Sequence, residues 1–195
     1  YIRFAHFTAG YLLAVGLIGR SYWALVGNHH AREMFWVPIF QKAYWNEVLT
    51  MLKWYAFLIP RPGRYVGHNP LGSLSVFALL GFLAAQVATG LVADDEIASV
   101  GPLNRFVSGA LAGRATHWHK DYGQWILIGL VLLHVAAIVF YLLRKKRNLV
   151  RPMIVGDKTL PSGTPASADS PGTRALALLL AVLCGAGVAW VVGLG

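Results

Sequence analysis

The stretch HKDYGQWILIGLVLLHVAAIVFYLL, residues 119–143, decides the fold. From Tyr122 to Leu143 it contains no Asp, Glu, Lys or Arg, and about 20 apolar residues are enough to cross the hydrocarbon core of a bilayer. Two histidines mark the stretch, since His119 stands at its start and His134 lies deep inside it. It predicts a membrane-spanning helix with an imidazole toward each end.

Three more segments have the same character. Leu71–Ala93 and Ala175–Gly195 carry no charge over a spanning length, and Phe4–Val26 is interrupted only by His6 near its start and Arg20 near its end. A long arginine side chain can reach the headgroups from a helix end. The chain of 195 residues is 56% hydrophobic and 13% charged, which excludes an ordinary soluble core. We predict an all-α integral membrane bundle with four transmembrane helices.

The segments between the spans differ in composition. Ala43–Ile59 mixes five aromatic residues with Glu47 and Lys53, which is typical of an amphipathic helix lying in the headgroup region. A short surface helix is expected around Leu103–Leu111. Residues 1–156 then form the main membrane domain, 157–172 a flexible linker rich in Ser, Thr, Pro and Gly, and 173–195 an additional C-terminal transmembrane helix.

The net charge of +9 comes mainly from the segments between the spans. Five Lys and Arg lie in segment 27–70 and seven in 144–174, whereas 94–121 holds three against four acidic residues. Loops rich in Lys and Arg stay on the cytoplasmic side. The charge is therefore a topology signal and not evidence of nucleic-acid binding. We expect a multi-pass protein of the bacterial inner membrane, with both ends of this chain outward.

The histidines suggest a cofactor. Because the first and third spans both run inward, His6 and His119 lie at the same outer depth, and His134 lies about 22 Å deeper at 1.5 Å per residue. Two neutral imidazoles on facing helices can supply both axial nitrogens of a haem b, a six-coordinate site that transfers electrons without activating a substrate. The single cysteine, Cys184, leaves no C-x-x-C-H motif for covalent haem attachment. His134 is costly in an apolar helix unless bonded, which favours a second ligand role.

Residues close in sequence to the outer histidines fit this interpretation. Gly10 and Gly123 follow His6 and His119 at i+4, on the same helix face, where a porphyrin plane could lie against backbone. Arg3, Arg114 and Lys120 are candidates to pair with the haem propionates, and interface anchoring explains them equally well. His117 points to a different helix face and is assigned to the surface or to a hydrogen bond beside the site.

Two other classes of protein are considered. In a non-redox membrane anchor or assembly subunit of a respiratory complex, the histidines and aromatic residues would only hold helices at the interface. A transporter is disfavoured, because the spans contain neither broken mid-membrane helices nor acidic residues.

Three motifs carry a resemblance to a known family: Tyr1-Ile2-Arg3-Phe4-Ala5-His6-Phe7, then Gly27-Asn28-His29-His30-Ala31-Arg32-Glu33 with Val37-Pro38, and Gly67-His68-Asn69-Pro70. Through them the chain resembles, from Tyr1 to about Ala93, the cytochrome b subunit of membrane-bound nickel–iron hydrogenases. These subunits fall within the bacterial cytochrome b561 and formate dehydrogenase gamma-subunit group.

The resemblance implies a ligand set. His6 and His119 would hold an outer haem, and His134 an inner haem together with a histidine of a first family helix, usually marked by Arg-x-Trp-His-Trp, which has no counterpart in this sequence. One or two haems b are therefore expected. The family spacing between the last two ligands is usually 14, whereas 15 separates His119 from His134. Around the axis of a regular helix, a spacing of 14 places the second side chain about −40° from the first, and a spacing of 15 places it about +60° from the first.

The resemblance also implies a function. The chain would be the electron-transfer subunit of an oxidoreductase complex, and not its catalytic subunit. It would take electrons from a periplasmic redox enzyme, such as a nickel–iron hydrogenase, and pass them to a quinone. His68 and Asn69 weakly resemble the family's quinone site; a turn leading into the second span explains Gly67–Pro70 equally well.

Overall fold

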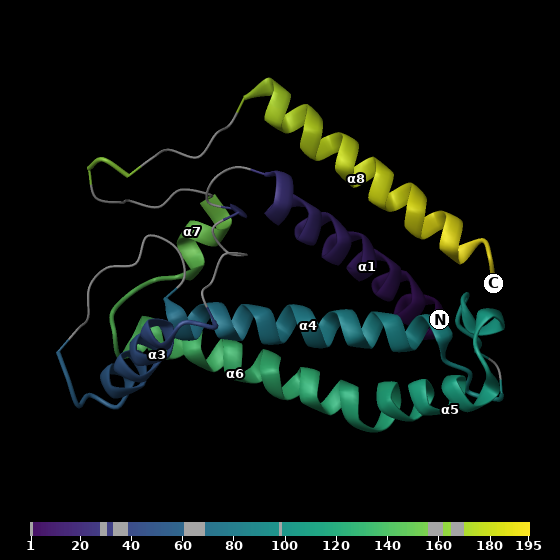
Figure 1. The fold of residues 1–195 in the computed structure, drawn as a ribbon, viewed down its shortest axis with the longest axis horizontal. Helices are drawn as coiled ribbons and strands as arrows, with labels where there is room; N and C mark the ends of the chain where they lie inside the picture. Colours follow the sequence, from purple (N-terminus) through teal and green to yellow (C-terminus); the bar gives the residue numbers. More distant parts are fainter. Residues whose placement is uncertain are drawn as a thin grey trace.

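The computed structural model describes residues 2–27, 31–32, 39–60, 69–97, 99–155, 162–164 and 170–195. Across these ranges the chain is helical, and an isolated bridge between Asp94 and Val100 is the only β-pairing they contain. The elements, shown in Figure 1, are α1 (Ile2–Val26), α3 (Lys42–Tyr55), α4 (Pro70–Val92), the 3-10 turn η2 (Asn104–Phe106), α5 (Gly109–His117), the π-helical turn η3 (Trp118–Gly123), α6 (Gln124–Leu143), α7 (Val150–Val155) and α8 (Pro171–Val192).

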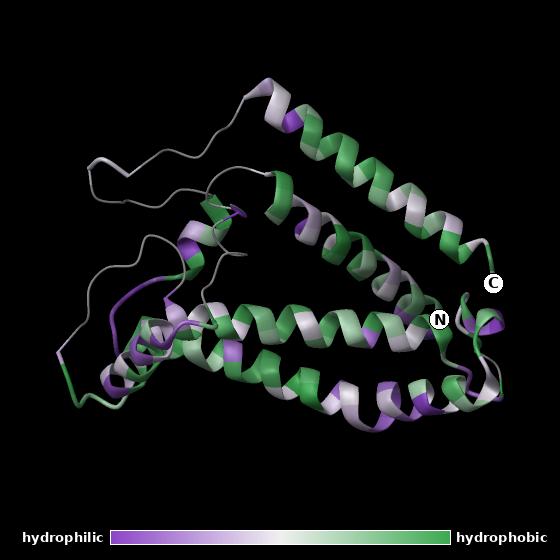
Figure 2. Ribbon diagram, in the orientation of Figure 1, coloured by the Kyte–Doolittle hydropathy of each residue, from purple (hydrophilic) through white to green (hydrophobic). Residues whose placement is uncertain are grey.

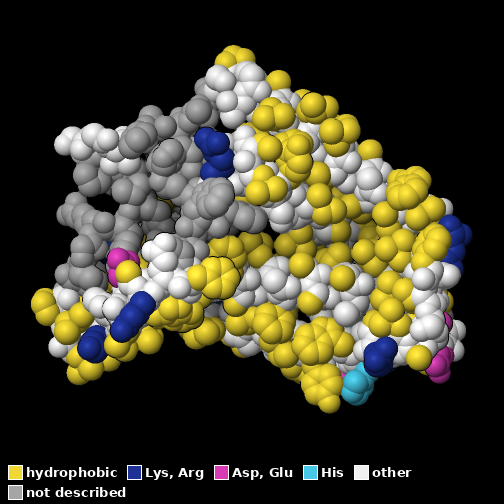
Figure 3. Space-filling view, in the orientation of Figure 1, with side chains coloured by type: hydrophobic (Ala, Val, Ile, Leu, Met, Phe, Trp, Pro, Cys, Tyr) yellow, Lys and Arg dark blue, Asp and Glu magenta, His cyan; other side chains and the backbone are white. Residues whose placement is uncertain are grey.

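Four helices are long and apolar enough to cross a membrane: Ile2–Val26, Pro70–Val92, Gly109–Leu143 and Pro171–Val192. They confirm the predicted all-α architecture with four spans. Figure 2 shows mostly hydrophobic residues along α1, α4, α6 and α8 and more hydrophilic ones in α5 and η3, and in Figure 3 basic side chains lie toward the periphery of the apolar surface. Many large apolar side chains of the spans are exposed, as lipid-facing surfaces require.

Helix α4 occupies the centre of the bundle. It packs against α6, against the start of α1, α5 and η3 at its C-terminal end, and against α3 at its other end. Helix α8 packs along α1. Figure 1 shows both ends of the chain at the end of the bundle that also holds the connection between α4 and α5. Side chains of α1, α4 and η3 can therefore meet at this end.

Local sequence signals explain where the helices begin. The Asn69 side chain accepts a hydrogen bond from Gly72 N at 2.8 Å, and Pro70 follows at the first helical position of α4. Ser170 caps α8 in the same way, again followed by a proline, Pro171. Ser108 caps α5 by accepting from Leu111 N.

The predicted surface helix at Leu103–Leu111 is wrong. Residues 104–106 form one 3-10 turn, Val107 is extended, and a new helix begins at Gly109 behind the Ser108 cap. This helix continues through η3 into α6 over 35 residues, because nothing from Gly109 to Leu143 breaks it. His119 therefore lies inside a long helix and not in its opening turn.

The predicted interfacial helix at Ala43–Ile59 appears as α3, Lys42–Tyr55. Its buried residues Met51 and Trp54 form a core cluster with Tyr141 of α6. The Tyr55 hydroxyl donates to the Tyr141 hydroxyl at 2.8 Å. The chain ends α3 with Phe57 in the left-handed region, at φ 59°.

Lys145, just beyond α6, ties this end of the bundle together. Its ammonium nitrogen lies 4.1 Å from the ring centre of Trp54 and 3.8 Å from that of Phe57, and it donates to the Trp54 carbonyl at 3.0 Å. Desolvation lowers the pKa of this lysine below its usual range. We refer to Met51, Trp54, Tyr55, Phe57, Asn69, Tyr141 and Lys145 as the aromatic end of the bundle.

Candidate haem site

His6 and His119 meet at the other end of the bundle. Their ring centres are 5.9 Å apart and the ring planes cross at 86°. His6 lies in the opening turns of α1, where its ring also contacts Phe7, and His119 lies in η3. His6 is exposed and His119 half-buried in the isolated chain. Two residues separated by more than a hundred positions in sequence thus bring two imidazoles together.

Helix α4 orients the ring of His119. Its Nδ1 lies 2.9 Å from the main-chain oxygen of Gln86 and 3.3 Å from Oγ1 of Thr89. A carbonyl oxygen can only accept, so Nδ1 carries the hydrogen and Nε2 of the neutral ring keeps its lone pair. The structure thereby selects the nitrogen that can bind a metal.

Gly90 completes the contact of α4 with His119. A Cβ at this position would lie 2.9 Å from Cε1 of the imidazole, closer than two carbon atoms approach. Only glycine lets the ring lie directly against the backbone of α4. Gln86, Thr89 and Gly90 follow the i, i+3, i+4 pattern of one helix face, and all three contact the same side chain.

Two cavities flank the imidazole pair. The first, of about 270 Å³, is lined mainly by apolar residues and glycine, among them Phe7, Gly10, Leu91 and Leu127. The second, of about 350 Å³, which we call the polar cavity, also has charged and polar residues in its lining, among them Arg3, Asp95, Ser99 and Lys120. Both cavities share five lining residues: His6, Phe7, Gln86, Gly90 and His119. Apolar residues and the basic residues Arg3 and Lys120 thus both lie beside the pair, which suits a ligand with an apolar body and acidic edges.

The donor set fits a haem. The ring centres of His6 and His119 are 5.9 Å apart, near enough for the two imidazoles to hold one haem iron. Among the described residues no three His, Cys, Asp or Glu side chains gather as metal ligands. A structural metal ion usually needs four protein ligands, whereas haem iron needs only axial ones.

Of the other residues predicted around the haem, some line a cavity beside the histidines and others do not. Gly10 lines the apolar cavity, and a Cβ there would meet nothing within 4 Å. Arg3 lines the polar cavity and approaches Ser99 Oγ at 3.5 Å. Arg114 is exposed on α5 and lines neither cavity. Gly123 packs against the side chain of Gln86 and lines neither cavity.

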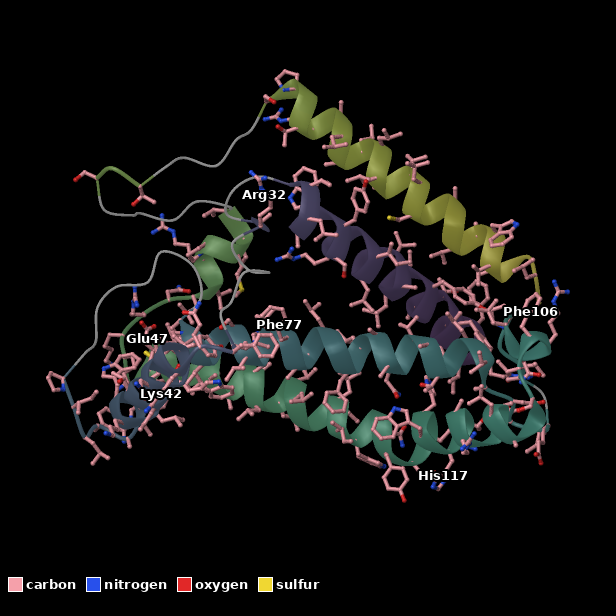
Figure 4. All side chains as sticks on the ribbon, in the orientation of Figure 1. Arg32, Lys42, Glu47, Phe77, Phe106 and His117 are labelled. Carbon is pink, nitrogen blue, oxygen red and sulfur yellow. The ribbon has the colours of Figure 1, made fainter. Side chains whose placement is uncertain are left out.

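The remaining histidines lie away from this pair. His117 points outward from the bundle (Figure 4) and contacts Asp121 at 2.6 Å, in agreement with its predicted surface position. His134 is half-buried on α6 and makes no hydrogen bond to a described residue. His29, His30 and His68 fall outside the described residues.

Asn69 has a structural role at the start of α4. Besides capping the helix, its amide donates to the Tyr141 hydroxyl at 2.9 Å. Both polar atoms of its side chain are engaged, as expected of the turn that leads into the second span. Its suggested contact with a quinone stays a prediction.

Sequence reasoning missed Gln86, Thr89 and Gly90. A signal was present for Gln86, because a carboxamide inside an uncharged span is costly unless it is hydrogen-bonded. Thr89 and Gly90 gave no comparable signal, since small residues are frequent in transmembrane helices.

Comparison with known proteins adds independent findings. Residues 1–156 match the family model described as prokaryotic cytochrome b561. The chain is 42% identical to a probable Ni/Fe-hydrogenase B-type cytochrome subunit of Cupriavidus necator, over 82% of this chain and 68% of that protein. Similarly named subunits of Azotobacter vinelandii and Escherichia coli K12 are 37% and 34% identical, over 85% and 69% of this chain and 71% and 60% of theirs. No solved structure gives a significant match.

Proposed function

The chain belongs to the prokaryotic cytochrome b561 family, and on that premise we propose that it carries electrons through the membrane between a redox enzyme at its outer face and the quinone pool. It is a multi-pass membrane protein of the b-type cytochromes. The observation that carries the proposal is the pairing of His6 with His119, in which the main chain of α4 leaves Nε2 of His119 available as a ligand.

Each part of the site has a role in this function. His6 and His119 would supply the two axial nitrogens, and haem b supplies one-electron redox chemistry when it is bound. Phe7 and Leu127 line the apolar cavity and would contact the porphyrin, while Arg3 and Lys120 in the polar cavity are placed to pair with carboxylates. Held by these two histidines, the haem would transfer electrons without binding oxygen.

The direction of transfer rests on the charge pattern and on the relatives. The basic segments 27–70 and 144–174 favour the cytoplasmic side of a bacterial inner membrane. That orientation places His6, His119 and both chain ends outward. Relatives named as hydrogenase cytochrome subunits suggest a Ni/Fe-hydrogenase as the electron donor at this face.

The second haem and the quinone would bind at the opposite face. His134 would serve a second haem, with a partner ligand that is not among the described residues. A quinone would approach at that end, where His68 and Asn69 resemble the family pattern. The outer pair on its own already supports the electron-transfer function.

An absorption spectrum of the purified protein tests the proposal. The wild type should show the reduced bands of a six-coordinate bis-histidine haem b, and His6→Ala and His119→Ala should each abolish the outer site. His117→Ala is the matched control, because this exposed histidine lies two residues from His119 and contacts Asp121. A colourless wild type, or an unchanged spectrum in His119→Ala, would refute the proposal and favour a non-redox anchor.

A further inference from the structure

Gln86 and His119 hold each other through two reciprocal hydrogen bonds. The side-chain nitrogen Nε2 of Gln86 donates to the main-chain oxygen of His119 at 3.0 Å. In return, Nδ1 of the His119 ring donates to the main-chain oxygen of Gln86 at 2.9 Å. Each residue thus uses its side chain to bind the backbone of the other, across two separate helices.

The burial of Gln86 makes its hydrogen bond important. The residue is only 9% exposed, on the central helix of the bundle, in a span without charged residues. An amide buried in such surroundings is costly unless it is bonded, and the carbonyl of His119 bonds its nitrogen. Loss of this contact would leave a buried donor unsatisfied.

The partner of Gln86 is an unusual segment of helix. Residues 118–123 form a π-helical turn, in which each N–H bonds one residue further back than in an α-helix. Such turns occur mostly as single wide turns inside α-helices and often lie at functional sites. The amide of Gln86 attaches this wide turn to α4, and the stacked rings of Phe82 and Trp118, 6.5 Å apart, support the same contact.

Gly123 makes room for the contact at the far end of the wide turn. A Cβ there would overlap Oε1 of Gln86 and lie 2.8 Å from its Cδ. Within the structure Oε1 is buried without a hydrogen-bond partner. The amide is therefore held between the carbonyl of His119 and the bare backbone of Gly123, and it has little freedom to reorient.

We infer that Gln86 is a positioning residue, which anchors the wide turn 118–123 to α4 and so fixes the direction of the His119 imidazole toward His6. The anchor follows from the contacts alone. Its consequence for ligand binding rests on the proposed haem function. Gln86 does not touch the metal position; it acts through His119.

The test compares Gln86→Met with wild-type protein in lipid nanodiscs. Methionine keeps the length of the side chain and removes the donor. Hydrogen–deuterium exchange of residues 118–123 should be about fivefold faster, as loss of one hydrogen bond predicts. Haem affinity should fall about 10- to 100-fold, the usual effect of removing the group that orients a metal ligand, and the electron paramagnetic resonance signal of the ferric haem should shift.

Two further variants complete the test. Gln41→Met is the matched control, because Gln41 is exposed before α3 and its side chain caps nothing. Gly123→Ala pushes the amide from the opposite side and should reproduce the effects of Gln86→Met. Unchanged exchange at 118–123 in Gln86→Met would overturn the inference, whatever the haem content. Faster exchange in a protein that binds no haem would confirm the anchor and refute the proposed function instead.

Discussion

The two ends of the bundle differ in how their polar groups are used. At the aromatic end, the polar side chains bond to one another: Tyr55 and Asn69 both donate to the hydroxyl of Tyr141, and Lys145 donates to a carbonyl among aromatic rings. At the histidine end, the ring of His6 makes no hydrogen bond to a described residue, and two cavities lie beside it. At the aromatic end the hydrogen bonds of the polar groups are satisfied within the protein. At the histidine end imidazole nitrogens and cavity space remain available to a ligand.

This difference separates the stability of the protein from its function. The aromatic end contains the core cluster of Met51, Trp54 and Tyr141, which joins the interfacial helix α3 to the span α6. The histidine end leaves ligand atoms unused, and this is favourable only when a cofactor binds them. Variants at the aromatic end should therefore change unfolding, and variants at the histidine end should change haem binding.

The largest expected effect is at Trp54. Trp54→Ala should lower the free energy of unfolding by about 3–5 kcal/mol, because it removes a large buried ring and leaves a cavity. Trp190→Ala on α8 is the control, with a side chain that is 69% exposed, and it should change stability by about 0.5 kcal/mol or less. Denaturant unfolding in detergent measures both. A haem spectrum altered in folded Trp54→Ala would contradict the separation of the two ends.

The next effect is expected at Gly90. Gly90→Ala places a methyl group 2.9 Å from the imidazole of His119, and such overpacking costs about 1–3 kcal/mol. Displacement of the ring should weaken haem binding, measured as the rate of haem transfer to an acceptor protein. Gly81→Ala, on the same helix with open space around its Cβ, should leave the rate unchanged. Equal rates in both variants would mean that Gly90 does not set the ring position.

Tyr55→Phe tests the closed end more gently. Loss of the hydrogen bond to Tyr141 should cost about 0.5–1.5 kcal/mol, seen as a lower midpoint of thermal unfolding near pH 8. The haem spectrum should not change. Tyr22→Phe, which removes an exposed hydroxyl from α1, is the control and should not shift the midpoint.

The same variant has a pH signature. Burial, followed by the hydrogen bond with Tyr141, raises the pKa of Tyr55 above its ordinary value of 10.0. Above pH 10 the unfolded chain loses this proton while the native protein retains it, so stability falls as the pH rises. Between about pH 9 and 11, the range that brackets the ordinary tyrosine pKa, the free energy of unfolding should fall less in Tyr55→Phe than in the wild type. Parallel stability curves for the two proteins would contradict the assignment.

The smallest effect is expected from a deletion inside η3. A π turn holds one residue more than an α turn, so deleting Lys120 should convert the wide turn to a regular one and leave its flanks in register. The spectral bands of histidine ligation should remain, while haem affinity should fall modestly because Lys120 no longer lines the polar cavity. Deleting Leu132 in regular α6 should instead rotate the preceding helix by about 100° and abolish the site. Loss of haem in the Lys120 deletion would contradict this interpretation of the wide turn.

The wide turn also explains a feature of the sequence. His119 and His134 are 15 positions apart, which on a regular helix rotates them by about +60°. Because a π turn holds one residue more than an α turn, η3 shifts this rotation back by about 100°. Hydropathy cannot reveal this, because a π turn and an α turn have the same composition.

Other parts of the fold were predictable to different degrees. The four spans followed from long uncharged runs. The start of the third span could not be predicted in this way. Whether Ser108 caps a helix that continues from Gly109 depends on backbone geometry, and that geometry is the same for polar and apolar residues. The depth of His119 was thus predicted from the wrong helix start, and its proximity to His6 came from the packing of α1 on α4.

The sequence by itself determined the class of the protein, its four membrane helices and the two histidines that could share an iron, because hydropathy, charge and residue chemistry act locally along the chain. Only the tertiary structure decided that Gln86 and Gly90 face His119 and that Nε2 is the nitrogen left free. That choice depends on the rotation of α4 against a wide turn 33 residues away in sequence, and such a rotation is set by packing between helices and not by the composition of either.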